Sequence, residues 1–384
     1  MSKKRFDFLK DKFGAPKNGD ILITSVGTLG ITLLVNLDYD FYFKDGNLTW
    51  LKNIDPTIIN KDYLIQWLKS SFFFRQINNN NIGAVQKALT ISFLNTLEIE
   101  LPNLETQKQI AKVLSDLDAK IEVNNKINQE LEAMAKTLYD YSFVQFDFPD
   151  ANGKPYKSSG GKMVFNAELK REIPEGWEDG VLSDIADITM GQSPSGSSYN
   201  EDGIGTVFYQ GSTDFGSRFP TVRKYTTEPS RMAEENDILL SVRAPVGTLN
   251  QAMEDCCIGR GLAALREKEG SVSFLWSQME YFKQIFDRRN ASGTTFGSIT
   301  KDDLFGLKVC IPEKNILESF KKIADPLHHK IIVNSKQNQK LTELRDWLLP
   351  MLMNGQVRVW DGYGERVGEL GMVAEPQNEY GKHK

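Results

Sequence analysis

Two stretches of the chain, roughly residues 105–141 and 326–349, carry apolar residues alternately three and four positions apart. This spacing is typical of the seam of a coiled coil, in which one stripe of a helix packs against a second helix. At about 1.5 Å per residue, the first stretch predicts a helix about 55 Å long and the second a helix about 36 Å long. The predicted seam of the first helix is Ile110, Leu114, Leu117, Ile121, Asn124, Asn128, Leu131, Ala135 and Leu138.

The two predicted helices are near copies. "IEVNNKINQEL" at 121–131 and "IIVNSKQNQKL" at 331–341 share seven of eleven residues at an offset of 210. The same offset gives the second seam as Phe320, Ala324, Leu327, Ile331, Asn334, Asn338, Leu341, Arg345 and Leu348. A buried seam asparagine costs stability unless it is paired, and its known use is to fix helix register. We therefore expect the helices to meet antiparallel about a pseudo-twofold axis. The alternative is two unrelated amphipathic helices, each packed on its own domain.

Two prolines bear on the second helix. Pro326 lacks a backbone donor, so it is expected to kink the helix or to begin it. Pro350 is expected to interrupt or end it, close to the turn signal Asn354-Gly355.

The repeat extends into the segments that precede the helices. "GAVQKALTISFLNTLEIELP" (83–102) aligns with "GTTFGSITKDDLFGLKVCIP" (293–312), and "GDILITSVGTLG" (19–30) aligns with "NDILLSVRAPVG" (236–247) at an offset of 217. These segments combine strand-like runs that end in Pro or Gly with helical stretches at 61–77 and 273–286. A period near 210 residues predicts duplicated α+β domains rather than a solenoid.

The pattern predicts six segments along the chain. They are a first globular domain (1–104), a helix (105–145), a linker rich in Gly, Pro, Ser and Lys (146–172), a second globular domain (173–313), a second helix (314–358) and a polar tail (359–384). At the offset of 217, residue 1 corresponds to residue 218, whereas the second domain begins near 173. About 45 residues therefore have no counterpart, and the first domain is expected to be truncated.

Composition excludes several classes of function. The 384 residues carry a net charge of −5, with local basic clusters at 1–17 and 283–301. The sequence has no apolar run long enough for a transmembrane helix, and its three cysteines fit a reducing, cytoplasmic compartment. Cys256 and Cys257 are expected to be buried small side chains rather than a redox pair.

No catalytic or metal-binding pattern stands out. His328 and His329 are adjacent on the second helix, where we expect solvated surface, and His383 lies far away near the end of the chain. A loose nuclease-like pattern of Asp150, Glu168 and Lys170 flanks a stretch without strand signals, so we do not favour it. The sequence therefore predicts a chain that is not itself an enzyme and that holds no cofactor or metal.

Taken together, these segments resemble the specificity (S) subunit of type I restriction–modification systems. "IPEGWEDGVLSDIADITMGQSPS" (173–195) and "NDILLSVRAPVGTLN" (236–250) resemble parts of a target recognition domain. "FDFPDANGKPYKSSGGKMV" (146–164) is similar to the central segment of the family, and "LLPMLMNGQVRV" (348–359) to its close. The resemblance covers nearly all of residues 19–359.

The resemblance implies a division of labour. Each recognition domain reads a few base pairs of double-stranded DNA, and the paired helices hold the two domains apart, so that the site is bipartite. Half-sites read by two-domain proteins lie about 34–36 Å apart. Methylation of adenine from S-adenosylmethionine belongs to separate methyltransferase (M) subunits, two of which dock at the helices. ATP- and Mg-dependent cleavage belongs to restriction (R) subunits. The alternative is a truncated paralogue that binds M or S-like subunits without reading a full site.

Base-reading residues cannot be transferred from the family, so we choose polar residues on Gly-rich loops. In the second domain the candidates for base edges or phosphates are Gln192, Ser193, Gln210, Ser212, Arg243, Arg260, Thr294 and Thr295. The candidates for phosphates alone are Arg218, Arg223, Lys224, Arg288 and Arg289. In the first domain the candidates are Ser25, Thr28, Asn79, Asn80, Gln86 and Lys87.

Overall fold

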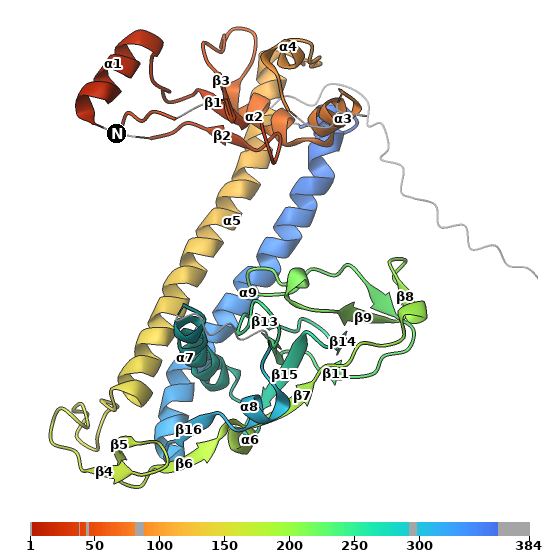
Figure 1. Cartoon of the computed structure of the whole chain (residues 1–384). Coiled ribbons are helices and arrows are strands. Elements are labelled where there is room, and N and C mark those ends of the chain that lie inside the picture. The colour runs from red at the N-terminus through yellow and green to blue at the C-terminus, as the bar shows by residue number, and fades with distance from the viewer. Residues whose placement is uncertain (1, 38, 44–45, 81–87, 292–297, 360–384) are drawn as a thin grey trace, which may run out of the picture. The chain divides into compact units, whose positions relative to one another are not determined.

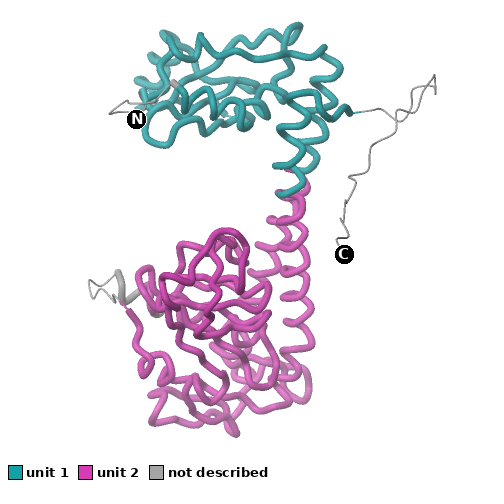
Figure 2. Tube along the Cα trace, turned by 90° about the vertical axis from the view of Figure 1, so that its right-hand side faces the viewer, with its two compact units in different colours: residues 1–117, 343–384 teal, residues 118–342 magenta. Residues whose placement is uncertain are grey.

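The computed structural model describes residues 2–37, 39–43, 46–80, 88–291 and 298–359. The chain divides into two compact units (Figure 2): unit 1 comprises residues 1–117 and 343–384, and unit 2 comprises residues 118–342. Two long helices, α5 (Leu104–Tyr139) and α9 (Lys314–Met353), each contribute one part to unit 1 and another to unit 2 (Figure 1). The combination of sheets with long helices confirms the predicted α+β class.

The second helix differs from its prediction. It begins at Lys314, twelve residues before Pro326, and runs through that proline. Pro326 removes one backbone hydrogen bond, but Phe320 and Ala324 before it and Ile331 after it are all buried. Burial of this apolar stripe on both sides of the proline outweighs the local loss, so the expectation that the helix begins at Pro326 is wrong. Pro350 lies in the last turn, three residues before the helix ends at Met353.

Unit 2 is built around two sheets. One has the order β13-β12-β15-β7 and the other β11-β14-β9-β10-β8, and two further strand pairs are β16-β6 and β4-β5. The strands are β4 (Met163–Asn166), β5 (Arg171–Pro174), β6 (Glu178–Val181), β7 (Ala186–Met190), β8 (Tyr199–Asn200), β9 (Thr206–Tyr209), β10 (Tyr225–Thr226), β11 (Met232–Ala233), β12 (Ile238–Ser241), β13 (Leu249–Gln251), β14 (Cys256–Ile258), β15 (Leu262–Glu267) and β16 (Lys308–Ile311). Its short helices are α6 (Leu182–Ile185) and α8 (Lys301–Phe305), with a π-helical turn at Asp140–Val144 and 3-10 turns at Gly196–Ser198 and Ser212–Asp214.

Strand β12 separates two cores of unit 2. Its alternate residues Ile238 and Leu240 pack in a cluster with helix α7 (Val272–Ala291), whereas Leu239 faces the five-stranded sheet. This alternation is the two-residue period of a strand covered on both faces. Cys256 and Cys257 are free and buried in β14, as the sequence predicts.

Unit 1 contains one three-stranded sheet with helices around it. Strands β1 (Ile21–Thr24), β2 (Thr32–Leu34) and β3 (Leu48–Leu51) have the order β2-β1-β3. The remaining helices are α1 (Lys3–Phe13), α2 (Lys61–Lys69), α3 (Ser71–Asn80) and α4 (Ile91–Leu94). Its core joins Ile21 and Ile23 of β1 to apolar residues of α2, of α3 and of the ends of α5 and α9.

The predicted duplication is present in the backbone. Ile21 pairs with Leu34 as Ile238 pairs with Gln251, so β1–β2 and β12–β13 share one register at the offset of 217. Strand β3 pairs with β1 as β15 pairs with β12. Even isolated bridges correspond, since Val26 pairs with Ala88 and Arg243 with Ser298.

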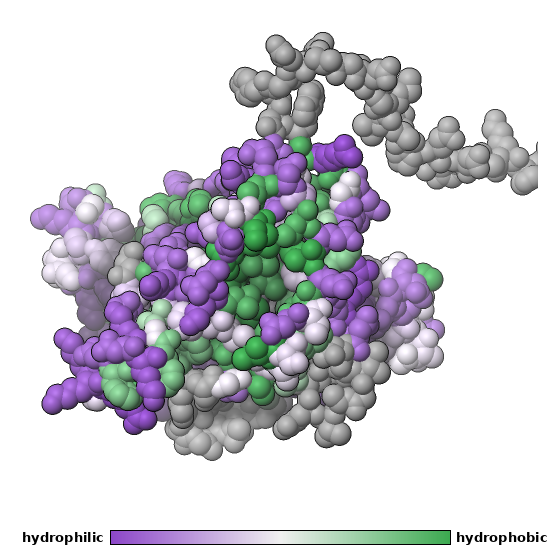
Figure 3. Space-filling view, turned by 90° about the horizontal axis from the view of Figure 1, so that it is seen from above, coloured by the Kyte–Doolittle hydropathy of each residue, from purple (hydrophilic) through white to green (hydrophobic). Residues whose placement is uncertain are grey.

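The last feature of the fold is where apolar residues lie along the described helices and on the surface of unit 1. None of the helices in the described ranges is long and apolar enough to cross a membrane. Unit 1 leaves several large apolar side chains exposed, among them Val26, Ile31 and Leu33. Figure 3 shows apolar residues gathered on one face and surrounded by polar residues.

Candidate nucleic-acid interface

Five of the predicted contact residues line one cleft of unit 2. They are Ser193, Gln210, Ser212, Arg243 and Arg260. Gly211, Thr213, Ala244 and Gly261 complete its lining, and its volume is about 230 Å³. We call this group of nine residues the recognition cleft.

Strand pairing brings the cleft residues together. β9 and β14 are parallel neighbours, with Tyr209 opposite Ile258. Residues that follow the two strands, Gln210 and Arg260, therefore emerge at the same edge of the sheet. β12 and β15 are antiparallel, with Ser241 opposite Leu262, which places Arg243 beside the turn that carries Arg260.

Local bonds hold the two arginine-bearing turns. The Ser241 hydroxyl donates to the carbonyl of Pro245 (2.6 Å) and accepts from the backbone N–H of Thr248 (2.8 Å). Gly259 and Gly261 lie so close to Gln210 that a Cβ at either position would come within 2.9 Å of its carbonyl oxygen. Glycine is therefore required where the Arg260 turn passes the end of β9.

The cleft is rich in hydrogen-bond donors. The side chains of Arg243 and Arg260 are exposed, and no carboxylate occurs among the described residues of the lining. The nearby carboxylate of Asp214 is buried and forms an ion pair with Arg223. Guanidinium, amide and hydroxyl groups together suit phosphate oxygens and base edges.

The other candidates of unit 2 lie outside this cleft. Gln192 is exposed next to Ser193, and its carbonyl accepts a bond from Ser230 (2.5 Å). Arg223 is half exposed, but its guanidinium is engaged by Asp214, and Lys224 is half-buried. Arg288 and Arg289 lie in helix α7. Thr294 and Thr295 lie outside the described residues.

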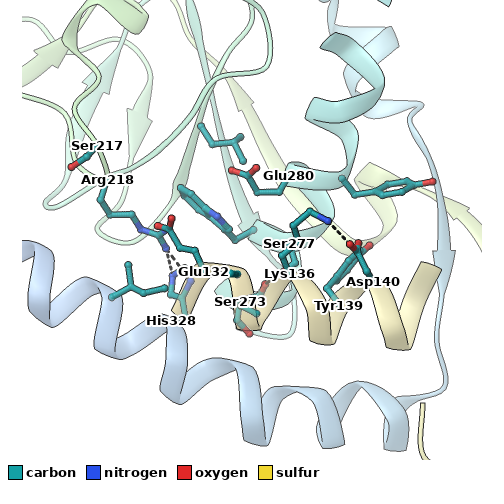
Figure 4. A pocket seen from close by; sticks show the side chains of 16 residues that line it. Glu132, Lys136, Tyr139, Asp140, Ser217, Arg218, Ser273, Ser277, Glu280 and His328 are labelled. Atoms are coloured by element: carbon teal, nitrogen blue, oxygen red, sulfur yellow. Dashed lines mark hydrogen bonds and ion pairs between the residues drawn. The ribbon is translucent and has the colours of Figure 1, made fainter. Parts of the chain in front are cut away.

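The prediction that Arg218 contacts phosphate at the surface is wrong, because this arginine is buried. Its side chain is only 3% exposed, at the edge of a separate cavity of about 340 Å³ (Figure 4). Its guanidinium stacks 3.6 Å from the ring centroid of Trp276, donates from Nε to Gln251 (3.2 Å) and contacts His328 (2.9 Å). Nη1 has no hydrogen-bond partner among the described residues and lies 4.0 Å from Glu132. An arginine buried in this way cannot reach a phosphate.

His328 is likewise not the solvated helix residue that the sequence suggested. It is 8% exposed because α9 turns this side chain toward Arg218 and Trp276. Burial, reinforced by the positive charge of Arg218, lowers the pKa of His328 from 6.5 to about 3. The imidazole is therefore neutral, which lets it accept a bond from Arg218. His329, the next residue, is exposed as expected.

The candidate DNA contacts of unit 1 include both buried and exposed residues. Ser25 is 2% exposed, and its hydroxyl bonds to Thr49 (2.5 Å), so the prediction that it contacts DNA is wrong. Burial follows from its position directly after β1, opposite β3. Thr28 and Asn79 are exposed, and Asn80 ends helix α3. Gln86 and Lys87 lie outside the described residues.

The seam asparagines bond between α5 and α9 within unit 2. Nδ2 of Asn124, which is 1% exposed, donates to the side-chain oxygens of Asn338 (2.8 Å) and Gln337 (2.9 Å). Nδ2 of Asn334 donates to Asn128 (2.9 Å). The α9 partner numbers fall as the α5 numbers rise, so the two segments run in opposite directions there.

The residues of the rejected nuclease pattern have structural partners. Asp150 accepts two backbone N–H bonds, from Asn152 and Lys154 (both 2.8 Å), and thereby closes a turn. Glu168 pairs with Lys308 (3.1 Å). In the part of the chain that the structure describes, no three His, Cys, Asp or Glu side chains form a group suited to a metal ion.

Sequence reasoning missed several residues around these sites. Thr213, Gly211 and Gly261 line the recognition cleft, and the Gly-x-Gly around Arg260 was the available signal, although alone it is weak. Trp276, Glu132 and Glu280 surround Arg218 from α7 and α5. No local pattern marks them, because their meeting depends on how the helices pack.

Comparisons with known proteins agree on one family. A family model described as the type I restriction modification DNA specificity domain matches residues 4–133 and 174–344. A Methanocaldococcus jannaschii protein named for the specificity subunit of the MjaX type I restriction enzyme is 32% identical over 352 residues, covering 89% of this chain and 79% of that protein. The HindI specificity subunit of Haemophilus influenzae is 26% identical over 419 residues, covering 89% of this chain and 87% of that protein.

A solved structure shares the fold. The type I restriction–modification S subunit from M. genitalium matches with a TM-score of 0.55 at 21% identity, covering 89% of this chain and 84% of that chain. With the family match over both halves of the sequence, the chain therefore belongs to the type I restriction modification DNA specificity domain family, the family of the type I specificity subunits.

Proposed function

We propose that the chain selects the DNA sequence on which a type I restriction–modification complex acts, and that it reads a bipartite site with one half-site for each unit. The observation that carries this is the duplicated scaffold: the same strands and the same turn occur in both units, and in unit 2 that turn lines a donor-rich cleft. Family membership supplies the class of target, double-stranded DNA.

The helices are proposed to form an antiparallel coiled coil with a pseudo-twofold axis. Two pairs of bonds support this. The bond from Asn124 to Asn338 has its counterpart at the offset of 210 in the bond from Asn334 to Asn128. The bond from Asn338 to Asn125 has its counterpart in the bond from Asn128 to Ser335. Reciprocal bonds of this kind fix one register, because a shifted pairing would leave buried amides without partners.

Two M subunits are proposed to dock on these helices. Exposed apolar residues recur at matching positions: Val123 and Met134 on α5 correspond to Val333 and Leu344 on α9. Apolar side chains exposed on a long helix suit a helical partner surface. Methylation from S-adenosylmethionine would then reside in the M subunits and ATP-dependent cleavage in R subunits, and this chain would contribute no catalytic group.

The domain organisation is proposed as the sequence predicts it. Recognition domains are proposed at 1–104 and 173–313, helical segments at 105–145 and 314–358, a linker at 146–172 and a polar tail at 359–384. Helix α9 itself ends at Met353, and the proposed linker contains strand β4 and the start of β5.

The proposal is tested by sequencing the methylated genome of the host with and without this gene. Loss of one bipartite adenine-methylation motif on deletion, and its return on complementation, is the expected result. An unchanged methylome would contradict DNA selection and favour a chain that only binds M or S-like subunits. Loss of a symmetric motif would instead mean that two copies each read with unit 2.

A further inference from the structure

We propose that Arg243 and Arg260 determine the sequence specificity of unit 2, and that each reads a guanine. This inference rests on the proposed function, since it names the bases that the recognition cleft would select. Three observations support it: the absence of ion-pair partners for these two arginines among the described residues, the hydrogen bonds that join the two turns, and the different residues at the corresponding positions of unit 1.

Three other arginines of unit 2 already have partners. Arg218 is buried against Trp276, Arg223 pairs with Asp214, and Arg266 pairs with Asp237 (2.7 Å) and Glu234 (2.6 Å). Arg243 and Arg260 line the cleft with exposed side chains, and neither has an ion-pair partner in the described ranges of the chain. Their donors are therefore available to DNA without the loss of an existing bond.

The backbone that carries both arginines is fixed. The Val242 N–H donates to the carbonyl of Gly261 (2.9 Å), so the two turns are bonded directly to each other. The Arg260 N–H also donates to the Ser193 hydroxyl (3.4 Å). Discrimination between bases requires donors held in a defined position, whereas a flexible lysine or arginine is sufficient for a phosphate.

The repeat separates scaffold from specificity. In unit 1 the Thr24 hydroxyl donates to the carbonyl of Thr28 and accepts from the N–H of Ile31, as Ser241 does with Pro245 and Thr248. The arginines, however, are not repeated. Strands β1 and β12 correspond at an offset of 217, so Val26 takes the place of Arg243. Strands β3 and β15 correspond at an offset of 214, because Ile21 pairs with Leu51 as Ile238 pairs with Leu265, so Gly46 takes the place of Arg260.

A side chain that only holds the phosphate backbone would serve both units equally. A side chain that reads a base must differ when the two half-sites differ. Both units have the same turn, but only unit 2 has the two arginines. We therefore assign Arg243 and Arg260 as specificity-determining residues of unit 2.

The chemistry of the cleft selects guanine. O6 and N7 of guanine are two acceptors side by side in the major groove, and a guanidinium group can donate to both. The described lining has no carboxylate to accept from the amino group of cytosine. The half-site of unit 2 is thus expected to contain G·C pairs opposite both arginines.

The test uses the complex of the full chain with its M subunit and a duplex that carries the motif found in the host methylome. Each guanine is replaced in turn by 7-deazaguanine, which lacks the N7 acceptor but still pairs with cytosine. We expect two positions, both in one half-site, to raise Kd roughly 5- to 50-fold. Arg243→Lys and Arg260→Lys keep the positive charge but remove the planar guanidinium group that can donate two bonds to one guanine. Each variant is therefore expected to bind duplexes with guanine and with 7-deazaguanine equally well at one of the two positions.

The control is Arg231→Lys, a change at an exposed arginine outside the cleft, which is expected to leave every Kd unchanged. If the wild-type complex shows no sequence-specific binding, the proposed function itself fails. If it binds specifically but 7-deazaguanine has no effect, or if the cleft variants weaken all duplexes equally, the arginines are phosphate contacts and this inference is overturned while the function stands. The wild-type measurement decides even if a variant fails to fold.

Discussion

Units 1 and 2 share three strands and one turn but differ in what covers them. In unit 2 the outer face of these strands, including Leu239, is closed by the five-stranded sheet. At the corresponding face of unit 1, Leu33 is 56% exposed. Strand β15 has β7 as a second neighbour, whereas β3 pairs only with β1 in the described part of the chain.

The turn nevertheless has the same hydrogen bonds in both units. Its geometry is therefore specified locally, by one hydroxyl residue at the end of a strand and a left-handed glycine, Gly30 or Gly247, six positions later. Because the covering layers do not determine the turn, its exposed side chains are free to differ. This is the property that a duplicated reader of unlike half-sites needs.

The largest expected loss of stability is at the face of β12 that the five-stranded sheet covers. Leu239→Ala removes a fully buried side chain between two sheets, and we expect it to lower the free energy of unfolding by about 3 kcal/mol. The matching change Leu22→Ala is expected to cost about half as much, because a cavity beside exposed Leu33 can admit water. Amide hydrogen exchange of β12 and of β1 measures each loss separately. Equal losses would mean that the two faces are closed equally well.

A second contrast is pH dependence. The described part of unit 1 contains no histidine, whereas unit 2 buries His328 with a pKa lowered from 6.5 to about 3. Below pH 6.5 only the unfolded state binds this proton, so the stability of unit 2 is expected to fall as pH falls, by up to about 1.4 kcal/mol per pH unit. Burial raises the pKa of Glu132 and Glu280, and proton uptake by these carboxyls in the folded state opposes this trend.

Hydrogen exchange at pH 7 and pH 5.5 checks this prediction. Unit 2 is expected to lose stability between the two values while unit 1 changes little. His328→Gln, which keeps an acceptor for Arg218, is expected to remove most of the difference. A pH dependence that survives in this variant would assign it to other groups.

The smallest contrast is at two helix caps. Thr90 and Thr300 both cap a short helix, accepting from the backbone N–H of Phe93 (3.1 Å) and of Asp303 (3.2 Å). Of the two, only Thr300 is part of a capping box, in which the carboxylate of Asp303 accepts from the backbone N–H of Thr300 (3.3 Å). We expect Thr300→Ala to cost about 1.5 kcal/mol and Thr90→Ala about 0.5–1 kcal/mol, measured by hydrogen exchange of α8 and α4. A larger loss at Thr90 would contradict this reading.

Periodic and repeated features were predictable from the sequence. The long helices, the paired asparagines and the duplication follow from spacing and identity, and the structure contains the expected asparagine bonds and strand pairs. Five of the candidate contact residues lie together in the cleft, because Gly and Pro mark the turns that follow strands.

The errors have a common physical cause. Pro326, Arg218, His328 and Ser25 were judged by residue type, but tertiary packing decides their environment. A buried stripe carries the helix through Pro326, and Trp276 and His328, from helices far apart in sequence, enclose Arg218. Sequence spacing identifies exposed turns, but it does not reveal which cationic side chain folds back into the protein.

The most direct test of the central claim exchanges side chains at one position of the shared turn. Val26→Arg in unit 1 and Arg243→Val in unit 2 change corresponding residues without altering the turn hydroxyls of Thr24 and Ser241. The methylated motif of a host that carries each variant is then sequenced. We predict that each variant changes or loses specificity in a different half of the motif. Changes in the same half, or a motif that is unaffected by both, would contradict the account of two units that read separate half-sites through one duplicated scaffold.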